Sequence, residues 1–176
     1  MKDESNINYS DPKIFEEFFR EHYQSLLQFA TYYVRDVQTA QDVVQDVFYN
    51  LWKNREHLDH VTNMKTYLYT ATRNQALKKK RWYNRVIKTF VNQDNVDLVD
   101  FSSQDVFELK ELYEQIEQVI KNFPPKCRTV FYLSRFEGLS NKEIAEIQSV
   151  SIKTVEAQIT KAIKILRKEI FPHLSQ

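Results

Sequence analysis

A shortage of glycine and proline restricts the secondary structure open to this chain. Its 176 residues include one glycine, Gly138, and four prolines, which leaves little material for hairpins or sharp loops. A hydrophobic content of 42% supports a packed core, and an aromatic content of 14% argues against disorder. Together these features predict an all-α protein.

Hydrophobic periodicity and capping residues predict helices in the first half of the chain. Asp11 and Pro12 fit an N-cap followed by proline at the first helical position. A second helix is expected from Ala40 to Arg55, opened by Thr39 with Asp42 three residues later. A third is expected from near residue 63 to at least residue 81, and at most to residue 90.

A helix-turn-helix is predicted around Gly138. Helices over residues 108–121 and up to residue 136 precede this glycine, which marks a sharp stop. Ser140 and Glu143 have capping-box spacing, and Ser151 follows a short break as a second cap candidate. Such a pair of helices places its second helix in the major groove of DNA.

The last helix has an apolar and a polar face. The apolar stripe, expected to pack inward, comprises Ile152, Val155, Ile159, Ile163, Leu166 and Ile170. The residues then expected to point outward, where they suit phosphates and base edges, are Lys153, Thr154, Glu156, Ala157, Thr160, Lys161 and Lys164. The alternative is an ordinary amphipathic hairpin with a solvated basic face.

Basic and aromatic residues alternate in the third predicted helix. The candidates are Tyr67, Tyr69, Arg73, Asn74, Lys78, Lys79, Lys80, Arg81 and Trp82. This mixture suits single-stranded nucleic acid, because cations hold the backbone and rings stack on unpaired bases. Two alternatives remain: aromatic residues in a core beside solvated lysines, or a helix on a membrane surface.

The second predicted helix carries polar groups beside an apolar stripe. Val44, Val47, Phe48 and Leu51 form the stripe. Asp42, Gln45, Asp46 and Tyr49 lie on the polar side, with Trp52 at the edge. Aromatic residues beside fixed polar groups suit docking on a partner helix, although such stripes are also common in ordinary core helices.

Charge and residue counts exclude several classes of function. The net charge is +1, but Lys and Arg outnumber Asp and Glu by 13 to 11 up to residue 85 and by 10 to 7 from residue 112. The intervening segment is acidic, with 2 against 6. The single cysteine, Cys127, permits no intrachain disulfide and is expected to be a small buried hydrophobe. No apolar run approaches transmembrane length and the N-terminus lacks a signal-peptide segment, so we expect a cytoplasmic protein with no direct membrane insertion. No catalytic constellation, metal site or cofactor motif is found, so we expect that the protein is not an enzyme.

The three motifs, in this order, resemble a bacterial RNA polymerase sigma factor of the extracytoplasmic-function (ECF) group. The resemblance covers residues 15–170. Its strings are Asp42 to Trp52, Tyr67 to Asn74 and Glu137 to Ala145. It implies two small helical domains joined by a flexible acidic linker: a disordered N-terminus at 1–11, a sigma region 2 domain at 12–90, the linker at 91–107 and a region 4 helix-turn-helix domain at 108–176.

The resemblance also implies roles for these motifs. The Asp42–Trp52 helix would dock on the clamp helices of the large subunit of core RNA polymerase. The segment over residues 63–85 would melt the −10 element and capture an exposed base. The last helix, with Ser151 near its start, would read the −35 element of promoter DNA. An anti-sigma factor, usually membrane-anchored, would hold the protein inactive.

Two positions depart from the family pattern. Gln148 and Ser149 stand where the family commonly has Leu-Gly, in a turn position that favours glycine. Lys78 stands where an acidic residue is common. The alternative function is a helix-turn-helix regulator of the response-regulator type that acts without docking on polymerase; a third is a helical scaffold that binds no DNA.

Overall fold

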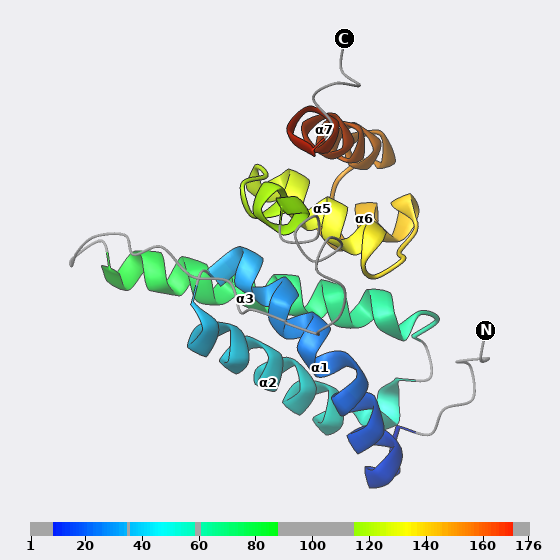
Figure 1. The fold of residues 1–176 in the computed structure, drawn as a ribbon. Coiled ribbons are helices and arrows are strands. Elements are labelled where there is room, and N and C mark those ends of the chain that lie inside the picture. Colours follow the sequence, from blue (N-terminus) through cyan, green and yellow to red (C-terminus); the bar gives the residue numbers. More distant parts are fainter. Residues whose placement is uncertain (1–8, 35, 59–60, 88–114, 171–176) are drawn as a thin grey trace. The chain divides into compact units, whose positions relative to one another are not determined.

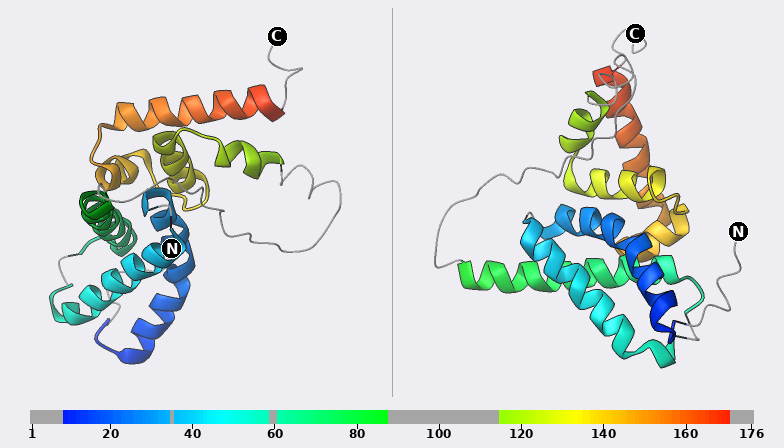
Figure 2. Two further views of the ribbon diagram at one scale, coloured as in Figure 1. Left: turned by 90° about the vertical axis from the view of Figure 1, so that its left-hand side faces the viewer. Right: turned by 60° about the horizontal axis from the view of Figure 1, so that its bottom comes forward.

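The computed structural model describes residues 9–34, 36–58, 61–87 and 115–170, and these ranges contain helices and their connections but no strand. The predicted all-α class is confirmed. Contacts divide the chain into two units, Met1–Val99 and Asp100–Gln176. Figures 1 and 2 show the helices of each unit. The predicted linker at residues 91–107, the predicted helix start at 108–114 and most of the predicted disordered N-terminus lie outside the described residues.

The first unit is built from three long helices that each pack on the other two (Figure 1): α1 (Pro12–Val34), α2 (Val37–Lys53) and α3 (Met64–Ile87). A short 3-10 helix, η2 (Arg55–His57), follows α2. The largest fully buried side chains of the unit are Tyr69, Phe29, Leu26, Leu51, Leu68, Val43 and Val44. These side chains fix the rotation of each helix about its own axis, and hence which face remains in water.

The helix starts follow local capping chemistry. At α1, Asp11 Oδ1 accepts a hydrogen bond from the Lys13 amide at 2.8 Å, and Pro12 is the first helical residue, as predicted. At α3, Asn63 Oδ1 accepts from the Thr66 amide at 2.8 Å. Both caps satisfy amides that have no partner within the helix.

The predicted start of α2 is wrong. The helix begins at Val37, and its N-cap is Asp36, whose carboxylate accepts hydrogen bonds from the Thr39 amide at 2.7 Å and from the Thr39 hydroxyl. Thr39 therefore lies inside the helix that it was expected to open. The pKa of Asp36 is lowered, chiefly by the hydrogen bond from the Thr39 hydroxyl and also by those from the amides of Thr39 and Gln38. Partial burial of the carboxylate opposes this shift.

The second unit packs its last helix on the two before it. Helical residues 115–121 precede α5 (Pro125–Arg135), α6 (Asn141–Gln148) and α7 (Ile152–Ile170), and α7 contacts both α5 and α6. Phe123, Cys127, Phe131 and Ala162 form one buried cluster. Cys127 is fully buried, as expected, and burial raises the pKa of its thiol, while Lys161 opposes this shift. Leu133, Ile144, Ile147 and Val155 are also fully buried in this unit.

Two left-handed residues set the course of the chain around α6. Gly138 has a φ of 65°, and a Cβ built there meets nothing within 4 Å, so conformation rather than space requires glycine. Ser149 has a φ of 54° and a ψ of 49°, and the Val150 amide donates to the Ala145 carbonyl at 3.0 Å. The turn thus takes the left-handed conformation for which the family commonly uses glycine, here at a serine.

Hydrogen bonds at both helix starts confirm the predicted caps of the helix-turn-helix. The Ser140 amide donates to Glu143 Oε2 at 2.8 Å, and the Glu143 amide donates to Ser140 Oγ at 3.3 Å, which makes a complete capping box. Ser151 Oγ accepts from the Thr154 amide at 3.1 Å and lies 2.8 Å from Thr154 Oγ1. Both helices of the motif are therefore fixed at their N-termini.

Candidate functional site

The polar side of α2 remains exposed after the three helices pack. Asp42, Gln45 and Tyr49 are exposed on one helix face, and Tyr49 keeps 65% of its surface in water. The opposite face is closed, because Val44, Val47, Phe48 and Leu51 are each no more than 5% exposed. The predicted division of α2 into an inner stripe and an outer polar side is confirmed.

The two remaining candidates on α2 lie at the edges of this face and make contacts within the unit. On the α3 side, Asp46 Oδ2 accepts from Gln75 Nε2 at 2.7 Å and lies 3.3 Å from Lys79 Nζ. On the α1 side, the Trp52 ring packs against Phe15 with centroids 4.8 Å apart. The Arg55 guanidinium lies 4.3 Å from the centre of the Trp52 ring. Both residues therefore also join helices.

The outer side of α3 presents an aromatic ring and a row of cations. Tyr67 is 40% exposed, and Asn74, Lys78, Lys80 and Arg81 are also exposed. Arg73 and Lys79 are half-buried, and Arg73 donates to the side chain of its neighbour Asn74 at 3.2 Å. Trp82 lies in α3, but its side chain is outside the described part of the structure. Tyr67, Asn74, Lys78 and Arg81 recur with helical spacing along one face of α3, where they can meet the same ligand, whereas Lys80 lies on another side of the helix.

The structure removes Tyr69 from the predicted interface. Its side chain is 1% exposed, and its ring lies edge-on to Phe29 with centroids 4.9 Å apart. Leu68, Thr72 and Ala76 are buried on the same side of α3. Tyr69 therefore belongs to the core and has no ring face available for stacking on a base.

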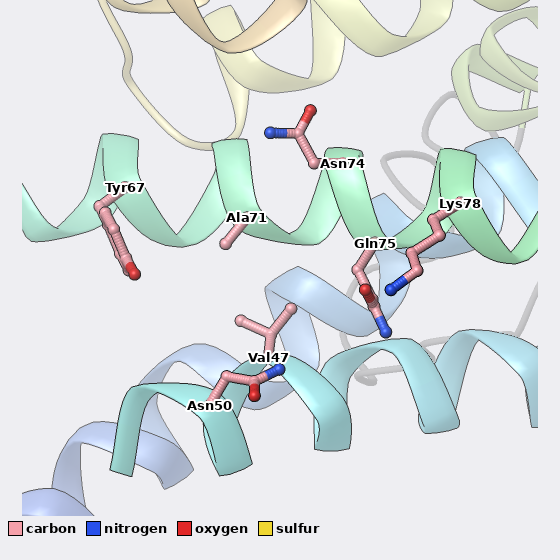
Figure 3. Close-up of a pocket in the computed structure, with 7 residues that line it drawn as sticks. All are labelled: Val47, Asn50, Tyr67, Ala71, Asn74, Gln75 and Lys78. Carbon is pink, nitrogen blue, oxygen red and sulfur yellow. The ribbon is translucent and has the colours of Figure 1, made fainter. Parts of the chain in front are cut away.

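An open cleft of about 260 Å³ lies between α2 and α3 (Figure 3). Its lining consists of Val47, Asn50, Tyr67, Ala71, Asn74, Gln75 and Lys78. Tyr67 and Lys78 lie at opposite ends of the part of α3 that lines the cleft (Figure 3). The amide side chains of Asn74 and Gln75 come from α3 between them, and the Asn50 amide comes from α2. The cleft thus combines a ring, several donors and acceptors, and a cation.

Four residues of this cleft were not among the predicted site residues: Val47, Asn50, Ala71 and Gln75. The i, i+4 spacing of Tyr67, Ala71 and Gln75 places them in one row along a helix. That spacing was the signal available in the sequence. The small Ala71 side chain between two larger ones leaves room in the cleft, but only the packing of α2 beside this row reveals it.

The start of α7 presents the predicted DNA-contacting residues to water. All eight are exposed: Ser151, Lys153, Thr154, Glu156, Ala157, Thr160, Lys161 and Lys164. Val155 and Ala162 are fully buried and hold the helix against the rest of the unit. The Ser151 hydroxyl, one of the eight, is engaged in capping the helix.

The predicted inward position of Ile152 is wrong. Ile152 is the first residue of α7 and is 45% exposed, and Val150 in the preceding turn is 41% exposed. The other members of the predicted stripe after Val155 are partly buried. Ile152 is exposed because α6 ends before this point, at Gln148, and the turn does not cover it.

The described residues offer no group of His, Cys, Asp and Glu side chains suited to holding a metal ion. Of the helices within the described ranges, none has the combination of length and hydropathy that a bilayer span requires. The features to be explained are therefore three exposed polar helix faces, two on the first unit and one on the second.

Each of the two units matches a known protein family. Residues 18–86 match Sigma-70 region 2, and residues 113–166 match Sigma-70, region 4. The ECF RNA polymerase sigma factor SigW of Bacillus subtilis is 30% identical over 146 residues, which cover 77% of each chain. The chain belongs to the ECF sigma factor family. Sigma factors bind core RNA polymerase and promoter DNA and direct transcription initiation, and they are not enzymes.

Further relatives agree with this assignment over almost the full length. RNA polymerase sigma factor YlaC of Bacillus subtilis is 24% identical over 162 residues, covering 88% of this sigma factor and 91% of YlaC. The sigma factor RpoE of Bartonella quintana, solved in complex with the anti-sigma factor NepR, has a similar fold: a TM-score of 0.66 at 20% identity, covering 89% of this chain and 96% of RpoE. The region 2 match means that a regulator using the C-terminal motif alone is not favoured.

Proposed function

We propose that the exposed face of α2 is the surface by which this sigma factor docks on the clamp helices of the large polymerase subunit. The observation that carries the proposal is that Tyr49 is 65% exposed on the same helix face as Asp42 and Gln45. The opposite face of this helix is buried in the core. An aromatic ring kept in water beside polar groups is typical of an interface anchor. Asp46 and Trp52 flank this anchor.

Replacing Tyr49 tests the docking surface. Hot-spot truncation costs about 2 kcal/mol or more, so Tyr49→Ala should weaken binding to core polymerase by roughly 30-fold. Tyr67→Ala is the matched control, because it removes a partly exposed tyrosine of the same unit from α3. Equal core affinity of the wild type and Tyr49→Ala would place the docking surface elsewhere.

The exposed side of α3, with its cleft, is proposed to bind the −10 element in single-stranded form. Tyr67 offers a ring face, the amides of Asn74 and Gln75 offer hydrogen bonds to a base edge, and Lys78 offers a cation for a phosphate. The remaining cations proposed to contact the backbone are Arg73, Lys79, Lys80 and Arg81. This arrangement matches the ring-and-cation pattern of proteins that bind unpaired strands.

Tyr67→Ala tests the proposed −10 site. One base stack contributes about 1–3 kcal/mol, so the variant should lose between roughly 5-fold and 150-fold in affinity for a single-stranded −10 oligonucleotide. Tyr49→Ala, now the control, should bind the oligonucleotide as the wild type does. Retained oligonucleotide binding by Tyr67→Ala would exclude Tyr67 as a stacking platform.

The exposed start of α7 is proposed to read the −35 element in duplex form. Thr154 and Glu156 near the helix start suit base edges, and Lys153, Lys161 and Lys164 suit phosphates. Supporting this, Val155 and Ala162 fix the helix rotation so that all of these side chains face outward. Ser151 holds the first turn of the helix in place through its cap.

An anti-sigma protein, anchored in the membrane, is proposed as the regulator of this cytoplasmic factor. The support is the fold shared with RpoE, whose structure was determined with the anti-sigma factor NepR. A regulator of this kind must prevent docking, so a purified candidate should compete with core polymerase for the wild-type chain. A candidate that leaves core binding and transcription unchanged is not an anti-sigma factor for this protein.

A further inference from the structure

Asp46 and Lys79 belong to two different proposed interfaces, yet they contact one another. Asp46 is on α2, beside the proposed polymerase-docking face, and Lys79 is on α3, within the proposed nucleic-acid face. The Lys79 ammonium lies 3.3 Å from Asp46 Oδ2. The Asp46 carboxylate is therefore shared between the docking helix and the helix that carries the cations.

The contact is well oriented but open to water. Gln75, one helical turn before Lys79, donates to the same Oδ2 atom of Asp46 at 2.7 Å. The Asp46 side chain is 43% exposed and the Lys79 side chain 34% exposed. An ion pair at such a position contributes little to stability, because water and salt screen it. Another charged group can therefore replace either member at small cost.

The pairing changes the charge that α3 offers to a phosphate. Lys78, Lys80 and Arg81 are exposed, whereas Lys79 is half-buried and its charge is partly neutralised by Asp46. Phosphate affinity depends on the number of cations that can reach the backbone. Release of Lys79 from Asp46 would thus add a cation to this face.

We propose that Asp46 couples docking on α2 to nucleic-acid binding on α3. A cationic group of the polymerase that pairs with Asp46 releases Lys79, which then contacts a phosphate of the single strand. Coupling between two sites is reciprocal, so strand binding by Lys79 also frees Asp46 for docking. In this account Asp46 is a positioning residue for Lys79 as well as a docking contact. The inference rests on the proposed function of α2 and α3.

The size of the coupling is limited by the strength of the ion pair. Exposed pairs contribute up to about 1 kcal/mol, which corresponds to a change of at most roughly five-fold in affinity. This modest effect is measurable as a change in salt dependence. For single strands, one additional phosphate contact steepens the slope of log affinity against log salt by about 0.7.

The test measures binding of the full chain, without polymerase, to a fluorescent single-stranded oligonucleotide over a range of salt concentrations. Asp46→Asn removes the charge but keeps an acceptor for Gln75. It should raise the affinity roughly two- to five-fold and steepen the salt slope. Asp42→Asn is the matched control: it makes the same charge change on the same helix at an exposed position outside the Lys79 contact.

The double variant separates release of Lys79 from simple loss of repulsion. If Asp46→Asn acts by freeing Lys79, its gain should disappear in a Lys79→Gln background. The proposal is overturned if the gain persists in Asp46→Asn/Lys79→Gln, or if Asp42→Asn gives the same gain, or if Asp46→Asn gives none. Lys78→Gln provides a background in which the gain should remain.

Labelling of lysines by an acylating reagent, read by mass spectrometry, tests the other direction. Adding core polymerase without DNA should raise the labelling of Lys79 relative to Lys80, although a bound protein usually protects lysines. If Tyr49→Ala weakens binding to core, so that the docking face is supported, unchanged or lower relative labelling of Lys79 in the wild-type chain would refute the coupling alone. Core binding that Tyr49→Ala leaves intact would instead refute the proposed docking face.

Discussion

The turn between α6 and α7 provides a stability prediction that can be worked from backbone geometry. Ser149 is exposed and has left-handed φ and ψ angles of 54° and 49°. An L-residue in this region costs about 1–2 kcal/mol relative to the right-handed region. Glycine removes that cost, but it gains more conformational freedom in the unfolded chain, an opposing effect of about 0.4–1 kcal/mol. Ser149→Gly should therefore raise the free energy of unfolding of the second unit by about 0.5–1 kcal/mol.

Gly138→Ala is the reciprocal change. A methyl group at Gly138 meets nothing within 4 Å, so its cost should be conformational alone. Both effects have the same origin, a φ of 65° at Gly138 and of 54° at Ser149. Alanine costs about 1–2 kcal/mol at this φ, and its smaller freedom in the unfolded chain offsets about 0.4–1 kcal/mol, so Gly138→Ala should lower the free energy of unfolding by about 0.5–1 kcal/mol. For a domain of this size, 1 kcal/mol shifts the Tm by about 4–8 °C.

The assay is urea and thermal unfolding of the full chain, followed by far-UV circular dichroism and by tryptophan fluorescence. Trp52 and Trp82 both belong to the first unit, so fluorescence serves as an internal control. The circular dichroism transition of the second unit should move up with Ser149→Gly and down with Gly138→Ala, while the fluorescence transition stays in place. A loss of stability in Ser149→Gly would refute the account of a strained turn.

Three further predictions concern the faces and caps described above. Lys153→Ala should weaken duplex −35 binding and reduce the salt slope by about 0.9, the value for one phosphate, whereas an unchanged slope would remove Lys153 from the contacts. Replacing thymine by uracil in the −35 duplex removes one methyl group. If Ile152 packs on such a methyl group, replacing thymine by uracil at one or more positions of the −35 duplex should weaken binding of the wild type roughly four-fold and leave binding of Ile152→Ala unchanged. Equal losses of affinity in both proteins would exclude the contact. Asp36→Ala should cost about 1 kcal/mol at neutral pH through the lost cap. Hydrogen bonds lower the pKa of Asp36 in the folded state, so the stability difference between wild type and Asp36→Ala is present above the ordinary Asp pKa of 3.8 and should shrink as the pH falls below it. Urea unfolding over that pH range can measure the change. A stability difference independent of pH would contradict a charged cap.

Local sequence signals predicted those parts of the fold that depend on neighbouring residues. The capping box at Ser140 and Glu143, the stop at Gly138 and the cap at Ser151 are all formed, because each needs only a few residues of chain. The start of α2 was harder. Asp36 and Thr39 both have suitable cap chemistry, and the choice between them depends on where α1 ends and which face of α2 is buried.

Facts that depend on packing between helices could not be derived from spacing. Helical spacing puts Tyr67 and Tyr69 on opposite faces of α3, but which of the two faces is buried depends on the packing of the other helices, including Phe29 on α1, against Tyr69. Ile152 fits the apolar period of α7, yet it lies beyond the end of α6 and is exposed. The hydrogen bond between Asp46 and Gln75 joins residues that are 29 positions apart.

Transcription reconstituted from purified parts tests the central claim most directly. Core RNA polymerase and a promoter carrying a spaced −35 and −10 element should give a specific transcript only when this chain is added. Tyr49→Ala, folded as judged by circular dichroism, should abolish or strongly reduce that transcript at limiting protein concentration. Wild-type transcript levels with Tyr49→Ala, or a transcript that does not depend on the added chain, would contradict the account.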